Sequence, residues 1–206
     1  MLFRSGTATF YESDVEVDRC ACRQARSEDA LNIVRCRFSI IGLSFADAAS
    51  DAIDLDFTDG NISASEFKSC GNECMDTAGS EVTLGEIKID GAGDKAVSAG
   101  EQSTVSAAGM DIRRPEIGPA SQDSSKIAAD GVGIADGSVG LAGYRRKKAF
   151  GPSIIEINRL QTHNLKTEYL LEQLSSISVD GVALQPNSLK LKELMYGVKY
   201  GKASRS

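Results

Sequence analysis

The sequence predicts an all-β protein built as a solenoid, in which short parallel strands stack in successive coils. A small residue recurs every 22 residues without a slip, and a bulky apolar residue follows nearly every copy. The small residues are Ala30, Ala52, Cys74, Ala96, Gly118 and Gly140. Between the copies, apolar residues alternate with others, as in Val82-x-Leu84 and Ile87-x-Ile89, and period-two alternation in short runs is typical of strands. A fixed period in the twenties with this alternation indicates a solenoid.

Each coil is expected to hold three short strands, the first of which begins at the repeated small residue. The pattern predicts about seven coils of 22 residues over residues 10–184. Residues 145–152 form an inserted loop rich in charge, with Gly-Pro at its end, and strand alternation resumes at Ile155-x-Ile157. A last coil runs through Tyr169 to Val179.

The two ends of the chain are expected to differ from the coils. Residues 1–9 are predicted to be disordered or a truncated N-terminal edge, because solenoid ends normally carry a cap over their strand edges. We therefore expect an upstream domain, and any export signal, to precede this sequence. Residues 185–206 are predicted to be a C-terminal cap and tail, with Leu189, Leu191, Leu194 and Tyr196 covering the open end of the core.

Composition excludes several classes of protein. The formal net charge is −6, which argues against general nucleic-acid binding because neutralising phosphates requires a basic surface. No apolar run approaches the roughly 18 residues that span a bilayer. Aromatic residues make up 6% of the chain and Trp is absent, as expected for a core of stacked aliphatic side chains.

The five cysteines, an odd number, lack the paired spacing of a structural zinc site. They are Cys20, Cys22, Cys36, Cys70 and Cys74. Two interpretations stay open. The thiols act as small, buried or half-buried apolar groups, or one pair forms a disulfide, for instance between neighbouring coils.

Strand parity separates a core column from an outward column. Successive side chains of a strand face opposite sides, so the apolar column that contains Ile53 faces the core and Asp54 faces outward. Asp76 follows Asp54 one coil later, at a spacing of roughly 4.8 Å between strands. Two carboxylates so close repel each other unless one gains a proton, a cation or a hydrogen-bond donor.

The outward column predicts a groove that is acidic at one end and basic at the other. Acids in the preceding turn extend the stripe, with Lys95 interrupting it and Glu101 just beyond. They are Glu28, Asp29, Asp51, Glu73 and Asp94, beside Asp54, Asp56 and Asp76. The basic loop, residues 145–148, leaves the far end of the same strand on a later coil.

Several runs resemble known proteins. The repeat with its outward acids resembles the right-handed parallel β-helix of the pectin-lyase-like superfamily, and some stretches are similar to bacterial surface β-helix proteins. Those stretches are residues 50–57, Gly93-Asp94-Lys95, Gly100-Glu101-Gln102-Ser103, residues 140–147 and residues 196–202. The resemblance covers about residues 10–202 and implies a secreted or cell-surface protein that handles polysaccharide in the groove over its first sheet.

Lyases of that superfamily hold Ca²⁺ with carboxylates and abstract a proton with Lys or Arg. The resemblance therefore implies Asp54, Asp56 and Asp76 as calcium ligands, with Lys95 as the base and Asp76 as its catalytic partner. It implies that an anionic polysaccharide contacts residues of the later coils. These are Tyr144, Arg145, Arg146, Lys147 and Glu101. The chain has one histidine, His163, and no Gly-His-Gly run, so a polygalacturonase-type mechanism is not expected.

Each of these assignments has a plainer alternative. Asp54 and Asp76 can stack as a hydrogen-bonded ladder, and Lys95 can form a structural ion pair, because surrounding acids raise the pKa of a lysine. The basic loop can be solvated, Tyr144 can pack under it, and His163 can be a surface residue. Three functions therefore remain open: a polysaccharide-binding or -processing module, a rigid structural or adhesive spacer, and a partner for another domain through the exposed solenoid end.

Overall fold

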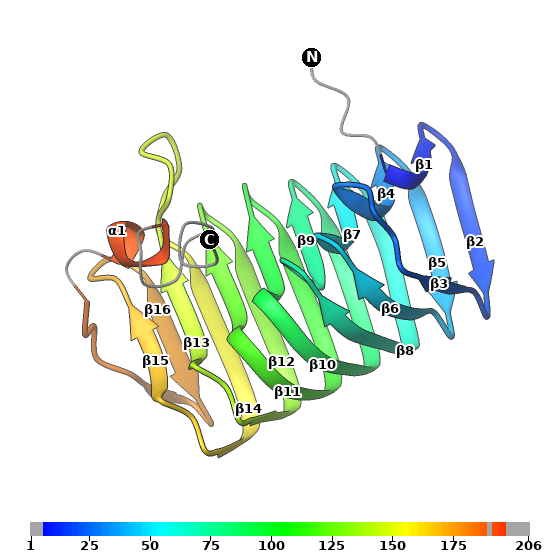
Figure 1. Ribbon diagram of the computed structural model, residues 1–206. Coiled ribbons are helices and arrows are strands. Elements are labelled where there is room, and N and C mark those ends of the chain that lie inside the picture. The colour runs from blue at the N-terminus through cyan, green and yellow to red at the C-terminus, as the bar shows by residue number, and fades with distance from the viewer. Residues whose placement is uncertain (1–5, 189–190, 197–206) are drawn as a thin grey trace.

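The computed structural model is a parallel β-solenoid of about eight turns of roughly 22 residues, with 70% of residues in strands and 2% in helix. It describes residues 6–188 and 191–196, apart from the side chains of Lys192 and Tyr196. Figure 1 shows the strands stacked side by side along one axis from the N-terminal to the C-terminal end. The predicted all-β solenoid is confirmed, with about one turn more than the seven expected.

Three stacks of parallel strands form the three faces of the solenoid. The first sheet contains β1 (Gly6–Tyr11), β4 (Asp29–Val34), β7 (Asp51–Asp56), β9 (Met75–Ala78), the ends of β10 (Glu81–Gly100) and β11 (Thr104–Gln122), β13 (Val139–Tyr144) and β15 (Thr167–Leu171). The second contains β2 (Asp14–Asp18), β5 (Arg37–Ile41), the first parts of β8 (Asp59–Cys70), β10, β11, β12 (Lys126–Ala135) and β14 (Ile154–His163), and β16 (Ser176–Val179). The third contains β3 (Ala21–Arg23), β6 (Ser44–Ala48) and the later parts of β8, β10, β11, β12 and β14. Long strands such as β10 therefore bend across more than one face.

The chain turns each corner with a residue in the left-handed region. Between the second and third sheets, Arg19, Ala64 and Glu86 have φ of 53°, 47° and 54°, and Gly42 and Gly109 take the same place in neighbouring coils. Left-handed backbone is costly for residues with a Cβ, so its repetition at one corner shows that stacking with neighbouring coils determines the turn.

The core is a column of aliphatic side chains with few rings. Ile53, Ile62 and Ile89 are at most 1% exposed, and the rings of Phe45 and Phe67 stack with centroids 5.6 Å apart. Gly60 is required beside Phe38, because a Cβ at Gly60 would lie 2.2 Å from the Phe38 carbonyl oxygen.

The ends of the described chain carry elements outside the regular coils. β1 begins at Gly6, within the segment expected to be disordered or a truncated edge, and it pairs with β4. At the other end, β17 (Val182–Ala183) pairs antiparallel with β16. The one described helix, α1 (Leu191–Tyr196), packs Leu191 and Met195 in a cluster separate from the main core. This part of the tail thus covers the flank of the first sheet, whereas we expected it over the end of the core. Leu189 lies outside the described residues. No described helix is long and apolar enough to cross a bilayer.

Candidate functional site

Two columns of side chains project from the first sheet away from the core, and we call them together the first-sheet face. Strand pairing aligns the members of each column from coil to coil. The first column is Asp29, Asp51, Glu73, Lys95, Ile117 and Val139, and the second is Asn32, Asp54, Asp76, Ser98, Ala120 and Ala142. The amide of Asn32 donates to Asp29 at 3.3 Å, and Ile117 and Ala120 share one apolar cluster. The two columns therefore lie on the same side of the sheet.

Strict alternation fails at the start of these strands. Ala52 and Ile53 are consecutive, yet both lie in the main core, and Leu55 joins them there. Asp54 falls between inward residues and faces outward, as parity predicted. Because Ala52 and Ile53 both point inward, Asp51, three positions before Asp54, also faces outward. Parity alone could not find that second column.

Lys95 lies at the end of the polar part of the face, next to Ile117 of the following coil, and is 2% exposed. Its Nζ donates to Glu73 Oε1 at 3.0 Å and to Asp94 Oδ2 at 2.5 Å. Both carboxylates stabilise the charged ammonium. A proton-abstracting base must be neutral and must reach its substrate. The geometry therefore fits the structural ion pair better than the catalytic base that the resemblance implied.

Asp51 and Glu73 form a second part of the same buried network. Asp51 Oδ1 accepts hydrogen bonds from the Glu73 backbone N–H at 2.9 Å and from the Asn72 amide at 2.7 Å. Burial and the charge of Glu73 raise the pKa of Asp51 to about 8. Burial alone would raise the pKa of Glu73 too, but the charge of Lys95 and several hydrogen bonds lower it to about 2. At neutral pH, Glu73 is thus ionised beside a protonated Asp51.

Asp54 and Asp76 occupy adjacent coils, as the sequence predicted, because β7 and β9 pair them directly. Burial and the charge of Glu73 raise the pKa of Asp76 to about 7, against the opposing effect of Lys95. Asp54 is 1% exposed. The like charge that raises the pKa of Asp76 is that of Glu73 in the first column, and the repulsion between Asp54 and Asp76 stays a prediction.

The three predicted calcium ligands, Asp54, Asp56 and Asp76, line one pocket of about 250 Å³. The other side chains around it are Phe57, Thr77, Ala78, Glu101, Gln122 and Arg146. Within the part of the chain that the structure describes, no three or more His, Cys, Asp or Glu side chains gather closely enough to hold a metal ion. The predicted ligands therefore share a pocket but do not form a ligand cluster.

The basic loop, residues 145–148, is anchored to the solenoid by acids. Arg146 pairs with Glu101 at 3.0 Å and with Asp123 at 3.3 Å, and Lys147 Nζ also contacts Glu101. Asp123 Oδ1 accepts both backbone N–H groups of Arg146 and Lys147 at 2.7 Å. The Arg145 backbone N–H donates to Glu172 Oε2 at 2.5 Å. Much of the loop's charge is therefore neutralised within the molecule.

Tyr144 is fully buried, in the cluster that contains Leu191 and Met195 of α1. A buried ring cannot stack on a sugar, so this structure does not fit the sugar-stacking role expected of Tyr144. The ring packs beside α1, whereas the alternative expectation placed it under the basic loop. His163 is exposed at the end of β14, as predicted for a surface residue.

The sequence analysis missed a ladder of hydroxyl groups along the corner between the first and second sheets. A side-chain oxygen of one coil accepts the backbone N–H of the preceding coil, from Thr58 N to Ser80 Oγ at 3.0 Å and from Ser103 N to Ser125 Oγ at 3.1 Å. The residues are Thr58, Ser80, Ser103, Ser125, Ser153 and Ser175, and Ser153 takes part through its backbone N–H, which donates to Ser175 Oγ, because its own hydroxyl has no hydrogen-bond partner among the described residues. Their spacing follows the coil period, apart from the loop insertion, and this signal could have revealed them.

Cys70 and Cys74 form a disulfide with Cα atoms 5.3 Å apart. It closes a corner within one coil, whereas we had considered a bridge between coils. Cys20 is exposed, Cys22 is half-buried with its pKa raised by burial, and Cys36 is buried. Of the two interpretations, the disulfide holds for one pair, and among the free thiols only Cys36 is fully buried.

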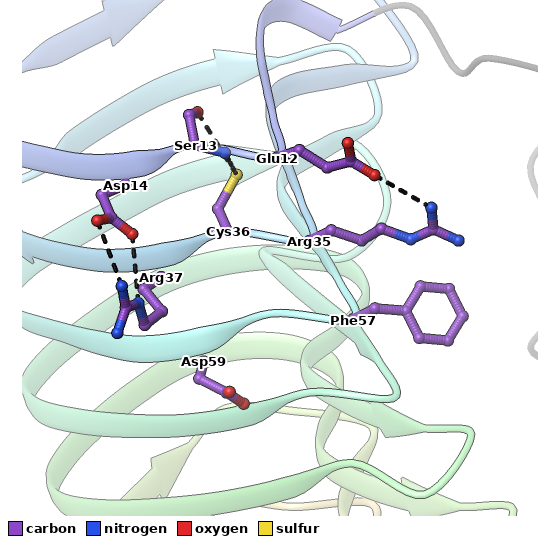
Figure 2. Close-up of a pocket in the computed structure, with 8 residues that line it drawn as sticks. All are labelled: Glu12, Ser13, Asp14, Arg35, Cys36, Arg37, Phe57 and Asp59. Carbon is purple, nitrogen blue, oxygen red and sulfur yellow. Dashed lines mark hydrogen bonds and ion pairs between the residues drawn. The ribbon is translucent and has the colours of Figure 1, made fainter.

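A second hollow, of about 450 Å³, lies at the N-terminal corner between the first and second sheets. Figure 2 shows two ion pairs across it, Arg35 with Glu12 and Arg37 with Asp14. All four side chains are more than half exposed, so the pairs are weak and screened by salt. This hollow offers no buried polar group aimed at a ligand other than the Cys36 thiol, which Ser13 already contacts.

No family model matches this chain, and no curated protein shows significant similarity to it.

Proposed function

We propose that the chain is a rigid, non-catalytic β-helix module that acts as a structural or adhesive spacer. The observation that carries this proposal is the state of Lys95, which is 2% exposed and held between Glu73 and Asp94. The side chains that would perform chemistry on the first-sheet face instead satisfy one another. Stacked coils joined by continuous backbone pairing resist bending, which suits a spacer.

The disulfide between Cys70 and Cys74 supports placing this module outside the cell or at its surface, because disulfides persist in oxidising compartments. The repeat and its outward acids support membership of the pectin-lyase-like superfamily. In this proposal the module is accessory to an upstream domain of the same protein, which would supply any chemistry.

The spacer proposal is tested by comparing the wild type with Lys95→Gln on uronate polymers, with and without Ca²⁺. We expect no unsaturated product from either protein. Release of unsaturated product by the wild type, lost in Lys95→Gln while the variant keeps its circular dichroism spectrum, would overturn the non-catalytic assignment and favour the metal-assisted lyase.

A second candidate is polysaccharide binding without turnover, favoured by the pocket beside Asp76. Carboxylate and amide groups at Asp54, Asp56 and Gln122 surround it, and the ring of Phe57 is 59% exposed at its rim. Such polar groups beside an exposed ring are suited to sugar hydroxyls and ring faces. The excess of carboxylates favours a neutral glycan, or an anionic one bridged by Ca²⁺.

This second candidate is tested on a glycan array with the wild type and Phe57→Ala, in Ca²⁺ and in chelator. Phe10→Ala is a matched control, because Phe10 is another exposed ring but does not line the pocket. Binding that Phe57→Ala removes and Phe10→Ala keeps would support the pocket. Equal binding of every glycan by the wild type and both variants would contradict a sugar-binding role of this pocket.

A further inference from the structure

The two ends of the described solenoid differ in how their strand edges are covered. At the C-terminal end, β17 pairs antiparallel with β16, and the Asn187 N–H donates to the carbonyl of Leu171 in β15 at 3.1 Å. At the N-terminal end, which Figure 1 shows with β1 and β2 outermost, β1, β2 and β3 pair with β4, β5 and β6. Among the described residues, the other edge of each of these three strands has no partner. An open strand edge is a template for pairing with another chain.

Apolar side chains of the first coil are exposed although their counterparts one coil later are buried. Phe10 is 37% exposed, whereas Ile33, its partner in register, is fully buried. Val17 and Cys22 are half-buried, in register with core residues of β5 and β6, and Cys20 is exposed. The core column is thus open at this end, and covering it would bury apolar surface, which favours association.

The cysteines favour a second copy of this chain as the partner that covers this end. Cys70 and Cys74 are joined in a disulfide, and Cys36 is buried. The two remaining thiols, Cys20 and Cys22, both lie at the open end. An odd number of cysteines in a disulfide-bonded protein indicates a thiol available for pairing between chains. Two identical edges pair about a two-fold axis, which sets the facing strands antiparallel, whereas stacking head to tail would require the covered C-terminal edges.

Charge selects which strands face each other across the two-fold axis. The outward side chains of β2 are all acidic, β1 has no charged residue, and β3 ends in Arg23. An axis through the second sheet would pair β2 with itself and set like charges opposite each other, which is destabilising. An axis through the third sheet would set the acids against the uncharged β1. An axis through the first sheet pairs β2 with β3 of the other copy, so that acids face an arginine.

Side-chain parity agrees with the axis through the first sheet. This axis leaves the solenoid at the corner between β2 and β3, between residues 19 and 20. The antiparallel register centred there sets Val17 against Cys22, both of which are core-facing positions. It also sets the outward Glu16 against the outward Arg23. Both are exposed, and neither has an ion-pair partner within the described part of the chain.

We propose that the open N-terminal end of the solenoid is a docking surface for a second copy of this chain, joined about a two-fold axis with β1 against β1 and β2 against β3. The interface continues the core from one copy into the other. Glu16 of each copy pairs with Arg23 of the other, and Cys20 of both copies lies beside the axis. The proposal goes beyond the spacer function and does not depend on it.

The proposal is tested on the full chain by sedimentation velocity over a range of protein concentrations. We expect a dimer for the wild type and about tenfold weaker dimerisation for Arg23→Glu, because two facing pairs change from attraction to repulsion. The charge swap Glu16→Arg/Arg23→Glu should restore the wild-type affinity. Lys148→Glu is the matched control, since it makes the same change of net charge at an exposed position away from this end.

Three results would overturn the proposal. They are a wild type that stays monomeric, dimerisation that Arg23→Glu leaves unchanged, and oligomers larger than a dimer, which would indicate stacking head to tail.

Oxidised glutathione provides the second measurement. Thiol–disulfide exchange joins the Sγ atoms of the two Cys20 residues, and the two protons and two electrons that these thiols lose reduce oxidised glutathione to two thiols. We expect a covalent dimer from the wild type and from Cys36→Ser, and none from Cys20→Ser. Peptide mapping should find the bond between the two copies of Cys20. A covalent dimer whose bond lacks Cys20, or a Cys20 that forms only a mixed disulfide with glutathione, would contradict the proposed axis.

Discussion

The backbone N–H of Ser80 donates to Oγ of Ser103 in the next coil at 3.1 Å, and Ser103 is 1% exposed. The Ser103 hydroxyl in turn donates to the Gly100 carbonyl at 2.7 Å. At the corner between the first and second sheets, some backbone N–H and C=O groups are not paired by the hydrogen bonds between parallel strands. A hydroxyl at this position satisfies a donor of one coil and an acceptor of its own, so the ladder joins coils where the strands stop.

Ser80→Ala is expected to destabilise the protein by about 1–3 kcal/mol, because it leaves a buried donor and acceptor without partners. Ser80 Oγ accepts from Thr58 N at 3.0 Å and donates to Leu55 O at 2.9 Å. Urea unfolding measures the change, and Ser106→Ala, at an exposed position, is the control. Equal midpoints for the two variants would contradict a stabilising role of the ladder.

Cys36 continues the ladder with sulfur in place of oxygen. Its Sγ accepts from Ser13 N at 3.5 Å and donates to Val34 O at 3.2 Å. We therefore expect Cys36→Ser to be more stable than Cys36→Ala by about 1 kcal/mol, because only the hydroxyl preserves both hydrogen bonds. Thermal unfolding of the two variants checks this. If alanine is tolerated as well as serine, the thiol acts only as an apolar group.

The disulfide gives a third prediction. Cys70 and Cys74 are four residues apart, and loop-closure entropy for so short a loop amounts to about 2 kcal/mol. Cys70→Ser/Cys74→Ser is expected to lose stability by that amount, and a reductant should lower the wild type to the same unfolding midpoint. Cys22→Ser is the control, because Cys22 is a free thiol. If reductant also lowered the unfolding midpoint of the double variant, the loss of stability would not come from the bond between Cys70 and Cys74.

Most of the fold was predictable because the repeat encodes it locally. The apolar column that contains Ile53 was predicted to face the core, and it does. The next residue, Asp54, was correctly predicted to face outward. Asp51 was expected in the acidic stripe from its place in the preceding turn, and strand parity could not place it, because Ala52 and Ile53 both turn inward and break the alternation. Strand parity assumes regular backbone, and the irregularity depends on stacking between coils.

The candidate site was predicted less well than the fold. That Asp54 and Asp76 are adjacent follows from the period alone. The burial of Tyr144 and Lys95 does not, because it depends on side chains distant in sequence. Arg146 pairs with Glu101, which lies 45 residues earlier, and a single sequence contains no signal for that partner.

Lys95→Met is expected to destabilise the protein by about 3–5 kcal/mol, because it leaves the buried Glu73 and the half-buried Asp94 without their ammonium. Adding Glu73→Gln to this variant should recover part of the loss, since one uncompensated charge is then removed. A double-mutant cycle by urea unfolding measures the coupling. Additive losses would show that Lys95 and Glu73 do not stabilise each other.

Stability should be greatest near pH 4, close to the ordinary pKa values of 3.8 for Asp51 and 4.5 for Glu73, because these two groups titrate in opposite directions. The folded pKa of Asp51 is about 8 against an ordinary 3.8, so its contribution is complete below pH 3.8 and is lost as pH rises through 8. The pKa of Glu73 is about 2 against 4.5, so its contribution is present above pH 4.5 and is lost as pH falls through 2. Asp76, with its pKa raised to about 7, adds to the loss at higher pH.

Asp51→Asn tests the upper side of this profile, because asparagine preserves the acceptor for Glu73 N and resembles the protonated acid. Urea unfolding across pH 5 to 8 should give a slope that is shallower than in the wild type by up to about 1.4 kcal/mol per pH unit. Asp111→Asn, at an exposed position, should leave the slope unchanged. A wild type whose stability rises from pH 5 to 8 would contradict a raised pKa of Asp51, since proton release on folding would then exceed uptake.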